Sequence, residues 1–211
     1  MKPYYEHAGI TIYHGDCREV LPWLEPADLV LTDPPYGHGE RWQGGTWGAA
    51  EMYRDAERWD AEKFQDITLS LILRLGYESI IWGGNYYQLP PSRCWFAWYK
   101  NPSLDTLADF ELAWTSFDRP SKSFFEDRNP DGKRMHPTQK PLSLMKWCIQ
   151  QCRFDDIAIT ILDPFMGSGT TLRAAKDLGR RAIGIEIEEK YCEIAAKRLS
   201  QEVLDFSNET K

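Results

Sequence analysis

The sequence has 211 residues, of which 42% are hydrophobic, and it carries a formal net charge of −7. This length and composition exclude a disordered chain and suffice for one domain with a buried core. No apolar run reaches the roughly 18 residues that a membrane-spanning helix needs, and the first ten residues, MKPYYEHAGI, lack the apolar region of a signal peptide. We therefore expect a single domain over 1–211, located in the cytoplasm, with no membrane partner.

Seven short runs of aliphatic and aromatic residues predict β-strands. The run ADLVLTDPP at 27–35 is almost continuously apolar, which is typical of a strand buried on both faces of a parallel sheet. The runs at 93–100 and 109–117 are predicted to pair as neighbours. In chain order the predicted strands are 10–16, 27–35, 79–84, 93–100, 109–117, 158–165 and 181–187.

Helices are predicted at 60–75, 141–152, 168–179 and 189–199. Pro141 suits the first turn of the second helix, and Gly179 suits the end of the third. Strands that alternate with helices indicate an α/β fold, with a mostly parallel, seven-stranded, Rossmann-like sheet and flanking helices. Two segments, 37–59 and 118–140, have no period and are interpreted as loops.

The five cysteines, at 17, 94, 148, 152 and 192, are odd in number and include no C-x-x-C pair. A fully paired disulfide framework is therefore excluded. Cys148 and Cys152 share one face of the predicted helix 141–152, but no partner pair with ligand spacing accompanies them. We expect two buried thiols there and no metal site in the protein.

The segment LDPFMGSGTT at 162–171 places glycines directly after a predicted buried strand and at the start of a helix. The backbone approaches a ligand closely at such a turn, and the free helix N–H groups favour polar or anionic atoms. Glu186 ends the next strand, where a carboxylate is placed to accept hydrogen bonds from ribose hydroxyl groups. Both the three-glycine phosphate fingerprint and the P-loop are absent, which favours a nucleoside without a pyrophosphate. A purely structural turn is the alternative.

Residues 33–36, Asp-Pro-Pro-Tyr, lie at the carboxyl end of the predicted strand 27–35. An ionised Asp33 only accepts hydrogen bonds, and the carbonyl of Pro34 is a second acceptor held by a rigid ring. The ring of Tyr36 suits stacking on a planar heterocycle. The four residues together fit an amino group attached to such a ring. The alternative is a rigid exit from the strand.

With HPTQKP at 136–141, these motifs resemble the beta class of amino DNA methyltransferases, in which the catalytic motif precedes the cofactor motif. The resemblance extends through GDCREVL, IIWGGNYY, DFELAWTS and GRRAIGIEIEEKYCEIAAKRL. It implies the class I methyltransferase fold in permuted motif order and S-adenosylmethionine as cofactor. It also implies restriction–modification and methylation of double-stranded DNA at N6 of a flipped-out adenine. The alternatives are cytosine N4, an RNA or protein amide, or a catalytically silent nucleic-acid-binding module.

The resemblance also implies roles for individual residues. Glu186 is expected to bind the cofactor ribose, Asp16 to lie near its adenine, and Lys140 to pair with its methionine carboxylate. The catalytic residues are Asp33, Pro34, Pro35 and Tyr36, and the cofactor-binding residues are Asp16, His136, Thr138, Lys140, Asp163, Phe165, Gly167, Gly169, Thr170 and Glu186.

The sequence departs from the family pattern in two respects. The usual Trp-Asp-Lys of the seventh motif is Trp98-Tyr99-Lys100 here, so the role of the middle acid has no residue to fill it. In so short a chain we expect no separate recognition domain of the usual size, so that target choice falls on 37–59 and 118–135 or recognition is relaxed. The segment 122–140 has a net charge of +2 and 172–181 one of +3; these charges do not exclude nucleic acid, but by themselves they indicate only ordinary solvated surfaces. Both a monomer and a homodimer fit the sequence.

Overall fold

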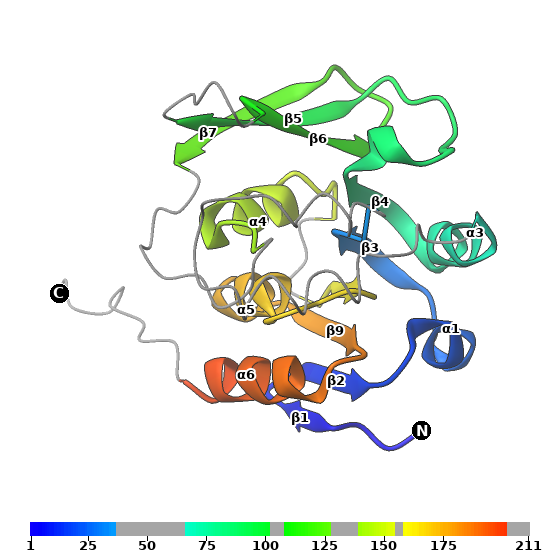
Figure 1. The fold of residues 1–211 in the computed structure, drawn as a ribbon, viewed down its shortest axis with the longest axis vertical. Coiled ribbons are helices and arrows are strands. Elements are labelled where there is room, and N and C mark those ends of the chain that lie inside the picture. Colours follow the sequence, from blue (N-terminus) through cyan, green and yellow to red (C-terminus); the bar gives the residue numbers. More distant parts are fainter. Residues whose placement is uncertain (37–65, 102–107, 128–138, 155–157, 202–211) are drawn as a thin grey trace, which may run out of the picture.

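The protein folds as an α/β domain with one large sheet and helices on both of its faces (Figure 1). The computed structural model describes residues 1–36, 66–101, 108–127, 139–154 and 158–201. The strands are β1 Tyr5–His7, β2 Ile10–His14, β3 Ala27–Thr32, β4 Gly76–Trp82, β5 Trp95–Asn101, β6 Phe110–Thr115, β7 Lys122–Asp127, β8 Thr160–Asp163 and β9 Arg181–Glu186. The α-helices are α1 Cys17–Val20, α3 Asp66–Leu75, α4 Leu142–Gln150, α5 Thr170–Asp177 and α6 Glu189–Ser200, and two 3₁₀ turns are η1 Leu21–Trp23 and η3 Gly84–Tyr86.

The sheet has the strand order β1-β2-β9-β8-β3-β4-β6-β5-β7. The five strands β2, β9, β8, β3 and β4 are parallel, so their carboxyl ends meet at one edge of the sheet. β6 runs antiparallel to both β4 and β5, β5 is parallel to β7, and β1 runs antiparallel to β2. The prediction of a mostly parallel sheet is confirmed, as is the pairing of the strands predicted at 93–100 and 109–117.

The prediction of seven strands is wrong, because the described residues form nine. β1 has only three residues and no buried side chain, so no apolar pattern marks it. β7 is an edge strand within the segment interpreted as a loop at 118–140, and its sequence KSFFED is polar at both ends. Of its two phenylalanines, Phe124 packs against Trp147 of α4 while Phe125 is exposed. An edge strand with one solvent-exposed face has too few apolar residues to be recognised by composition.

Alternate side chains of the central strand β3 belong to different cores. Leu29 and Leu31 of β3 belong to the larger core, which includes Leu144 of α4, whereas Val30 belongs to a second core with Ile72 of α3. Helices α4, α5 and α6 therefore cover one face of the sheet, and α1 and α3 cover the other, as Figure 1 shows. This arrangement explains why the sequence of β3 is apolar at nearly every position.

The predicted helices are confirmed where the structure describes them, with ends shifted by one or two residues. Pro141 is the N-cap of α4 and not a residue of its first turn. Residues 60–65 of the first predicted helix, the loop 37–59 and the part of the second loop from 128 to 138 lie outside the described residues. All five cysteines are free and buried, including Cys148 and Cys152.

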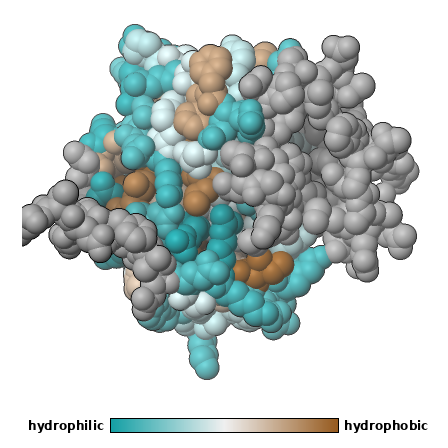
Figure 2. Space-filling view, turned by 90° about the vertical axis from the view of Figure 1, so that its left-hand side faces the viewer, coloured by the Kyte–Doolittle hydropathy of each residue, from teal (hydrophilic) through white to brown (hydrophobic). Residues whose placement is uncertain are grey.

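The surface turned toward the viewer in Figure 2 is mostly hydrophilic where described residues form it, and its apolar areas are small and separate. This is consistent with strands whose apolar side chains are buried between the two helical layers. Within the described ranges, no helix has both the length and the apolar character required to cross a membrane.

Candidate active site

Acidic residues stand at the carboxyl ends of four neighbouring parallel strands. Asp16 follows β2, Glu186 ends β9, Asp163 ends β8 and Asp33 follows β3. Ligands of open α/β sheets bind at this edge, outside the carboxyl ends of the strands. The structure thus brings together, along one edge, carboxylates that are up to 170 positions apart in the chain.

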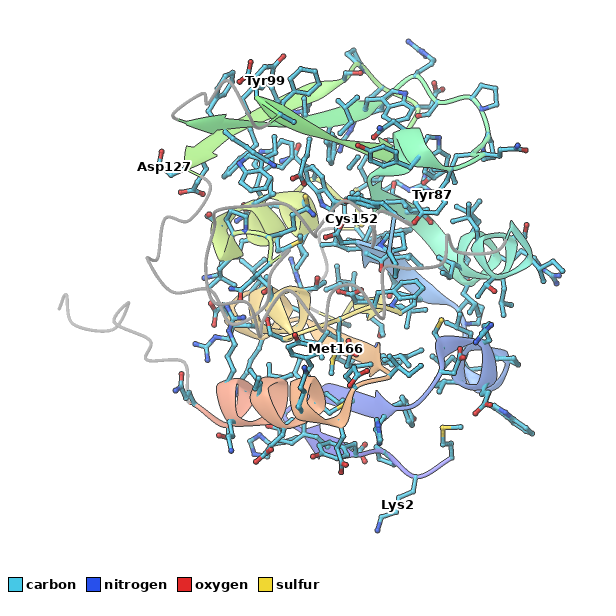
Figure 3. All side chains as sticks on the ribbon, viewed as in Figure 1. Lys2, Tyr87, Tyr99, Asp127, Cys152 and Met166 are labelled. Atoms are coloured by element: carbon cyan, nitrogen blue, oxygen red, sulfur yellow. The ribbon has the colours of Figure 1, made fainter. Side chains whose placement is uncertain are left out.

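Two hydrogen bonds hold residues 33–36, one within the segment and one from a neighbouring residue. The hydroxyl group of Tyr36 donates to Oδ1 of Asp33, and the hydroxyl group of Tyr87 donates to the carbonyl oxygen of Pro35. Tyr87, labelled in Figure 3, lies just beyond the end of β4. Pro34 is buried and lacks an N–H group to satisfy. The predicted rigid turn therefore has its carboxylate and its aromatic ring in contact with each other.

The ring of Tyr36 lies against the exit of β4. Gly83 has φ +66, and a Cβ atom added there would lie only 2.0 Å from Cε1 of Tyr36. The ring centroid of Tyr86 is 5.0 Å from that of Tyr36, at an interplanar angle of 31°. Glycine is required at position 83 both for its left-handed backbone and for the close approach of this ring.

The side chain of Lys140 lies beside the proposed catalytic carboxylate. Its Nζ is 2.5 Å from Oδ2 of Asp33 and 3.1 Å from Oε2 of Glu111 in β6. Lys100 of β5 forms an ion pair with the other oxygen of Glu111. The predicted contact between Lys140 and the methionine carboxylate of a cofactor stays a prediction, and neither Glu111 nor Lys100 was among the predicted site residues.

Burial and these charges shift the ionisation of the group. Burial raises the pKa of Asp33, and the ammonium of Lys140 opposes that rise. Burial, followed by the charge of Asp33, raises the pKa of Tyr36 well above its ordinary value, so the phenol keeps its proton and donates it. Burial alone would lower the pKa of Lys140, but the carboxylates of Asp33 and Glu111 raise it by more. The pKa of Lys140 therefore lies above its ordinary value, and the amine stays charged. Shifted pKa values of this kind cluster at functional sites.

The glycine loop between β8 and α5 is anchored by Asp163 and Glu186. Oδ1 of Asp163 accepts hydrogen bonds from Oγ1 of Thr32, at 2.8 Å, and from the backbone N–H of Phe165, at 3.1 Å. The backbone N–H of Gly167 donates to Oε2 of Glu186 at 3.0 Å. Burial raises the pKa of Asp163 to about 6 and that of Glu186 to about 7.

Two glycines of this loop have left-handed backbones, with φ +51 at Gly167 and φ +76 at Gly169. Gly169 is the N-cap of α5, and a Cβ atom there would lie 2.8 Å from Cβ of Ala195 in α6. Thr170 is buried and its hydroxyl accepts a hydrogen bond from Arg198, so it lies at the contact between α5 and α6. The predicted contact of Thr170 with a cofactor stays a prediction.

Asp16 caps helix α1. Its Oδ1 accepts the backbone N–H of Arg18 at 2.9 Å, and its carboxylate also binds the Arg18 guanidinium, whose hydrogen bonds lower the pKa of Asp16. The backbone N–H of Gly15 donates to the carbonyl oxygen of Glu186 at 2.9 Å. Asp16 is therefore fixed next to the end of β9, and its place beside the adenine of a cofactor stays a prediction.

Of the segment 136–141, His136 and Thr138 lie outside the described residues. Gln139 accepts a hydrogen bond from Oγ of Ser168 at 3.3 Å, which joins this segment to the glycine loop. No group of three or more His, Cys, Asp or Glu side chains suited to a metal ion occurs among the residues that the structure describes.

The chain is similar to known proteins in sequence and in fold. A family model described as DNA methylase matches residues 81–197. The type II methyltransferase M2.DpnII of Streptococcus pneumoniae is 52% identical over 256 aligned positions, which cover 95% of this chain and 93% of that protein. The crystal structure of the M1.HpyAVI–SAM complex has a TM-score of 0.63 at 24% identity, covering 91% of this chain and 100% of that one.

A second solved structure, the cytosine-N4-specific PvuII DNA methyltransferase, has a TM-score of 0.61 at 17% identity and covers 97% of this chain and 91% of that one. At these identities the two solved structures establish the fold alone. The predicted class I methyltransferase fold is confirmed, with nine strands in place of seven.

Proposed function

The chain belongs to the DNA methylase family, and on this premise we propose that it transfers a methyl group from S-adenosylmethionine to N6 of adenine in double-stranded DNA. The observation that carries the proposal is the position of Asp33 next to the glycine loop. The strands before them, β3 and β8, are paired neighbours, and Thr32 donates a hydrogen bond to Asp163 across that pair. A carboxylate that binds an amine thus stands beside a loop that binds a nucleoside.

The residues at the ends of β8, β9 and β2 fit S-adenosylmethionine. Gly167 and Gly169 turn the backbone in a conformation that brings no side chain between it and a ligand. The half-buried carboxylate of Glu186 suits the two ribose hydroxyl donors, and Asp16 suits the amino group of the adenine. Phe165 offers an aromatic face beside them. When bound, the cofactor supplies an electrophilic methyl group on a positively charged sulfur.

The target nitrogen needs help because its lone pair is delocalised into the ring. Asp33 and the carbonyl of Pro34 accept hydrogen bonds from its two N–H bonds, which favours a localised lone pair. The carboxylate of Asp33 also stabilises the positive charge that develops on the nitrogen, and it does so strongly because the site is largely buried. A raised pKa suits Asp33 to take up the proton that the methylated amine then loses.

A base inside a duplex cannot reach a carboxylate at this depth, so we infer that the target adenine is flipped out of the helix. The ring of Tyr36 stacks on it, and Tyr86 lies behind Tyr36 as a second aromatic ring. The segments 37–59 and 118–135 remain the proposed DNA contacts. Methylation of cellular DNA within a restriction–modification system implies a cytoplasmic protein, as a monomer or homodimer.

Cytosine N4 is the second candidate target, because it is also an exocyclic amine and because the cytosine-N4-specific PvuII enzyme has the same fold. Asp at position 33 favours adenine. In the family that the motif resembles, Asp at this position is typical of adenine N6 enzymes, whereas cytosine N4 enzymes usually have Ser. The deciding experiment incubates the purified protein with duplex DNA and methyl-labelled S-adenosylmethionine, then digests the DNA to nucleosides. Label in N6-methyladenine is expected. Label only in N4-methylcytosine contradicts the proposal, and so does label that appears only when RNA or protein replaces the DNA.

A further inference from the structure

Four side chains of alternating charge form a row that begins at Asp33. Lys140 contacts Asp33 and Glu111, and Glu111 contacts Lys100. The side chains of Lys140 and Lys100 are only 6% and 10% exposed, and Oε2 of Glu111 is buried. The formal charges of the row sum to zero. An array of this kind is stable in a protein interior only while each charge keeps its partner.

The row's four side chains come from four separate parts of the fold: the end of β3, the strands β5 and β6, and the segment before α4. Glu111 is opposite Trp98 in the pairing of β6 with β5, and Nζ of Lys100 lies 4.8 Å from the centroid of the Trp98 ring. Both charged residues therefore point to the sheet face that α4 covers, and Lys140 immediately precedes the N-cap of α4. Tyr99, between Trp98 and Lys100, points to the opposite face, where its side chain is 40% exposed and visible at the top of Figure 3.

The position of Glu111 determines how strongly Lys140 neutralises Asp33. Burial alone raises the pKa of Glu111, but the two ammonium groups lower it to about 2, so Glu111 is ionised in neutral solution. The ammonium of Lys140 is accordingly shared between two carboxylates. Without the charge of Glu111, Lys140 would pair with Asp33 alone, and Lys100 would add an uncompensated positive charge close to it.

We propose that Glu111 is a positioning residue for methyl transfer, which with Lys100 holds Lys140 between two carboxylates and so preserves negative charge on Asp33 for the target amine. This inference rests on the proposed role of Asp33. Its physical basis is that the amine becomes positive during transfer, so a net positive charge beside Asp33 opposes the reaction while leaving the cofactor loop untouched.

The test compares Glu111→Gln with the double variant Glu111→Gln/Lys100→Met. In the single variant we expect the single-turnover rate constant to fall about 10-fold or more, with the dissociation constant of S-adenosylmethionine within about 3-fold of wild type. The second substitution removes the unbalanced charge, so the double variant is expected to react at least about 3-fold faster than the single variant. A role in folding alone predicts the opposite, because two lost contacts destabilise more than one.

Glu78→Gln is the matched control. Glu78 is also a buried strand glutamate with a basic partner, Arg153, and among the described residues its carboxylate contacts Arg153 and the thiol of Cys152, outside the row. The single-turnover rate constant of Glu78→Gln is expected to stay within about 2-fold of wild type even if the unfolding temperature of this variant falls. Thermal unfolding of every variant separates lost stability from lost reactivity. Should Glu111→Gln fail to fold, the double variant carries the test, because its remaining charges are paired.

Two results would overturn the inference: an unchanged rate constant in Glu111→Gln, or a double variant as slow as the single one or slower. If the single variant does not fold, a folded double variant about 100-fold slower than wild type overturns it as well. The Asp33→Ala variant keeps these failures distinct from failure of the proposed function. If Asp33→Ala still methylates DNA, the proposed function fails; if it is inactive and Glu111→Gln is normal, only the role of Glu111 fails.

Discussion

The hydroxyl group of Tyr36 donates a hydrogen bond to Oδ1 of Asp33, so the proposed base-stacking residue is the hydrogen-bond partner of the proposed catalytic carboxylate. The other oxygen, Oδ2, is bound by Lys140. A target amine that binds Oδ1 must therefore replace the tyrosine hydroxyl, while the lysine contact persists. This relationship separates the two functions of Tyr36, its ring and its hydroxyl, and makes them testable one at a time.

Tyr36→Phe keeps the ring but removes the hydrogen bond that the target amine has to replace. In wild type, the hydrogen bond from Tyr36 to Asp33 is exchanged for one from the target amine, so losing the first bond costs the reaction little. We therefore expect the single-turnover rate constant of Tyr36→Phe to stay within about 3-fold of wild type. Tyr36→Ala removes the ring and is expected to weaken DNA binding by about 10-fold, since one stacked base is worth roughly 1–3 kcal/mol.

Fluorescence of 2-aminopurine at the target position measures base capture in both variants, and isothermal titration measures cofactor affinity. A loss of cofactor affinity in Tyr36→Ala as large as the loss of DNA affinity contradicts the stacking role.

Asp33→Ala is expected to abolish methyl transfer, with a rate constant at least about 100-fold below wild type, because the acceptor for the target amine and its compensating charge are both lost. Cofactor affinity should change little, since the contacts of the glycine loop with Glu186 do not involve Asp33. Methylation at close to the wild-type rate in this variant is incompatible with the proposed mechanism.

Glu186 predicts a pH dependence of cofactor binding. Burial raises its pKa to about 7, so the carboxyl is partly protonated near neutral pH. Its ionised form is the better acceptor for ribose hydroxyl groups, and we therefore expect S-adenosylmethionine to bind more tightly as the pH rises from about 6 to 8.

The Glu186→Gln variant is the control, because it cannot titrate: its affinity should be lower than that of wild type at pH 8 and should vary less with pH. An equally steep pH dependence in Glu186→Gln assigns the titration to another group, of which Asp163, with a pKa of about 6, is the nearest in chemistry.

The same shift has a consequence for stability. A carboxyl whose pKa is raised on folding binds more protons in the folded than in the unfolded state between its ordinary pKa of 4.5 and about 7. The free energy of unfolding of wild type is thus expected to fall as the pH rises through this window, and to fall less in Glu186→Gln. Urea titrations at pH 5 and pH 8 measure the difference.

Gly83→Ala tests the placement of the Tyr36 ring. The added methyl group meets that ring and also requires alanine to adopt a left-handed backbone, so we expect a loss of roughly 1–3 kcal/mol in stability together with slower methyl transfer. Combining it with Tyr36→Ala removes the clash but keeps the backbone strain, so the double variant should recover part of the lost stability. No recovery contradicts the observed packing, and denaturant titration distinguishes the two results.

Local patterns were sufficient to predict the central strands and the two loops that follow β3 and β8. The continuous apolar sequence of β3 requires burial on both faces, and Asp33 at its end is therefore placed by the sheet itself. The row from Asp33 to Lys100 was not predictable in the same way, because Asp33 and Lys140 are 107 positions apart and the motifs that contain Glu111 and Lys100 do not indicate which charges those side chains meet. Long-range ion pairs depend on strand order, and strand order is not encoded in spacing.

One departure from the family pattern has a structural explanation. Side chains alternate along a strand, so Trp98 and Lys100 face the α4 side of the sheet while Tyr99 faces outward. There its ring stacks on Phe125 of β7, with centroids 5.0 Å apart and planes at 12°. An acid at position 99 would thus be directed away from Asp33, and its replacement by tyrosine leaves the row of charges intact.

The pairing of β3 with β8 also bears on the motions that the reaction needs. Because both proposed loops extend directly from these two hydrogen-bonded strands, and Thr32 and Asp163 join them at their ends, the separation between the amine-binding and cofactor-binding groups changes little when whole elements move. The change at the amine-binding group is then local, because the hydroxyl of Tyr36 leaves Oδ1 of Asp33 by a movement of one side chain and not of a whole element.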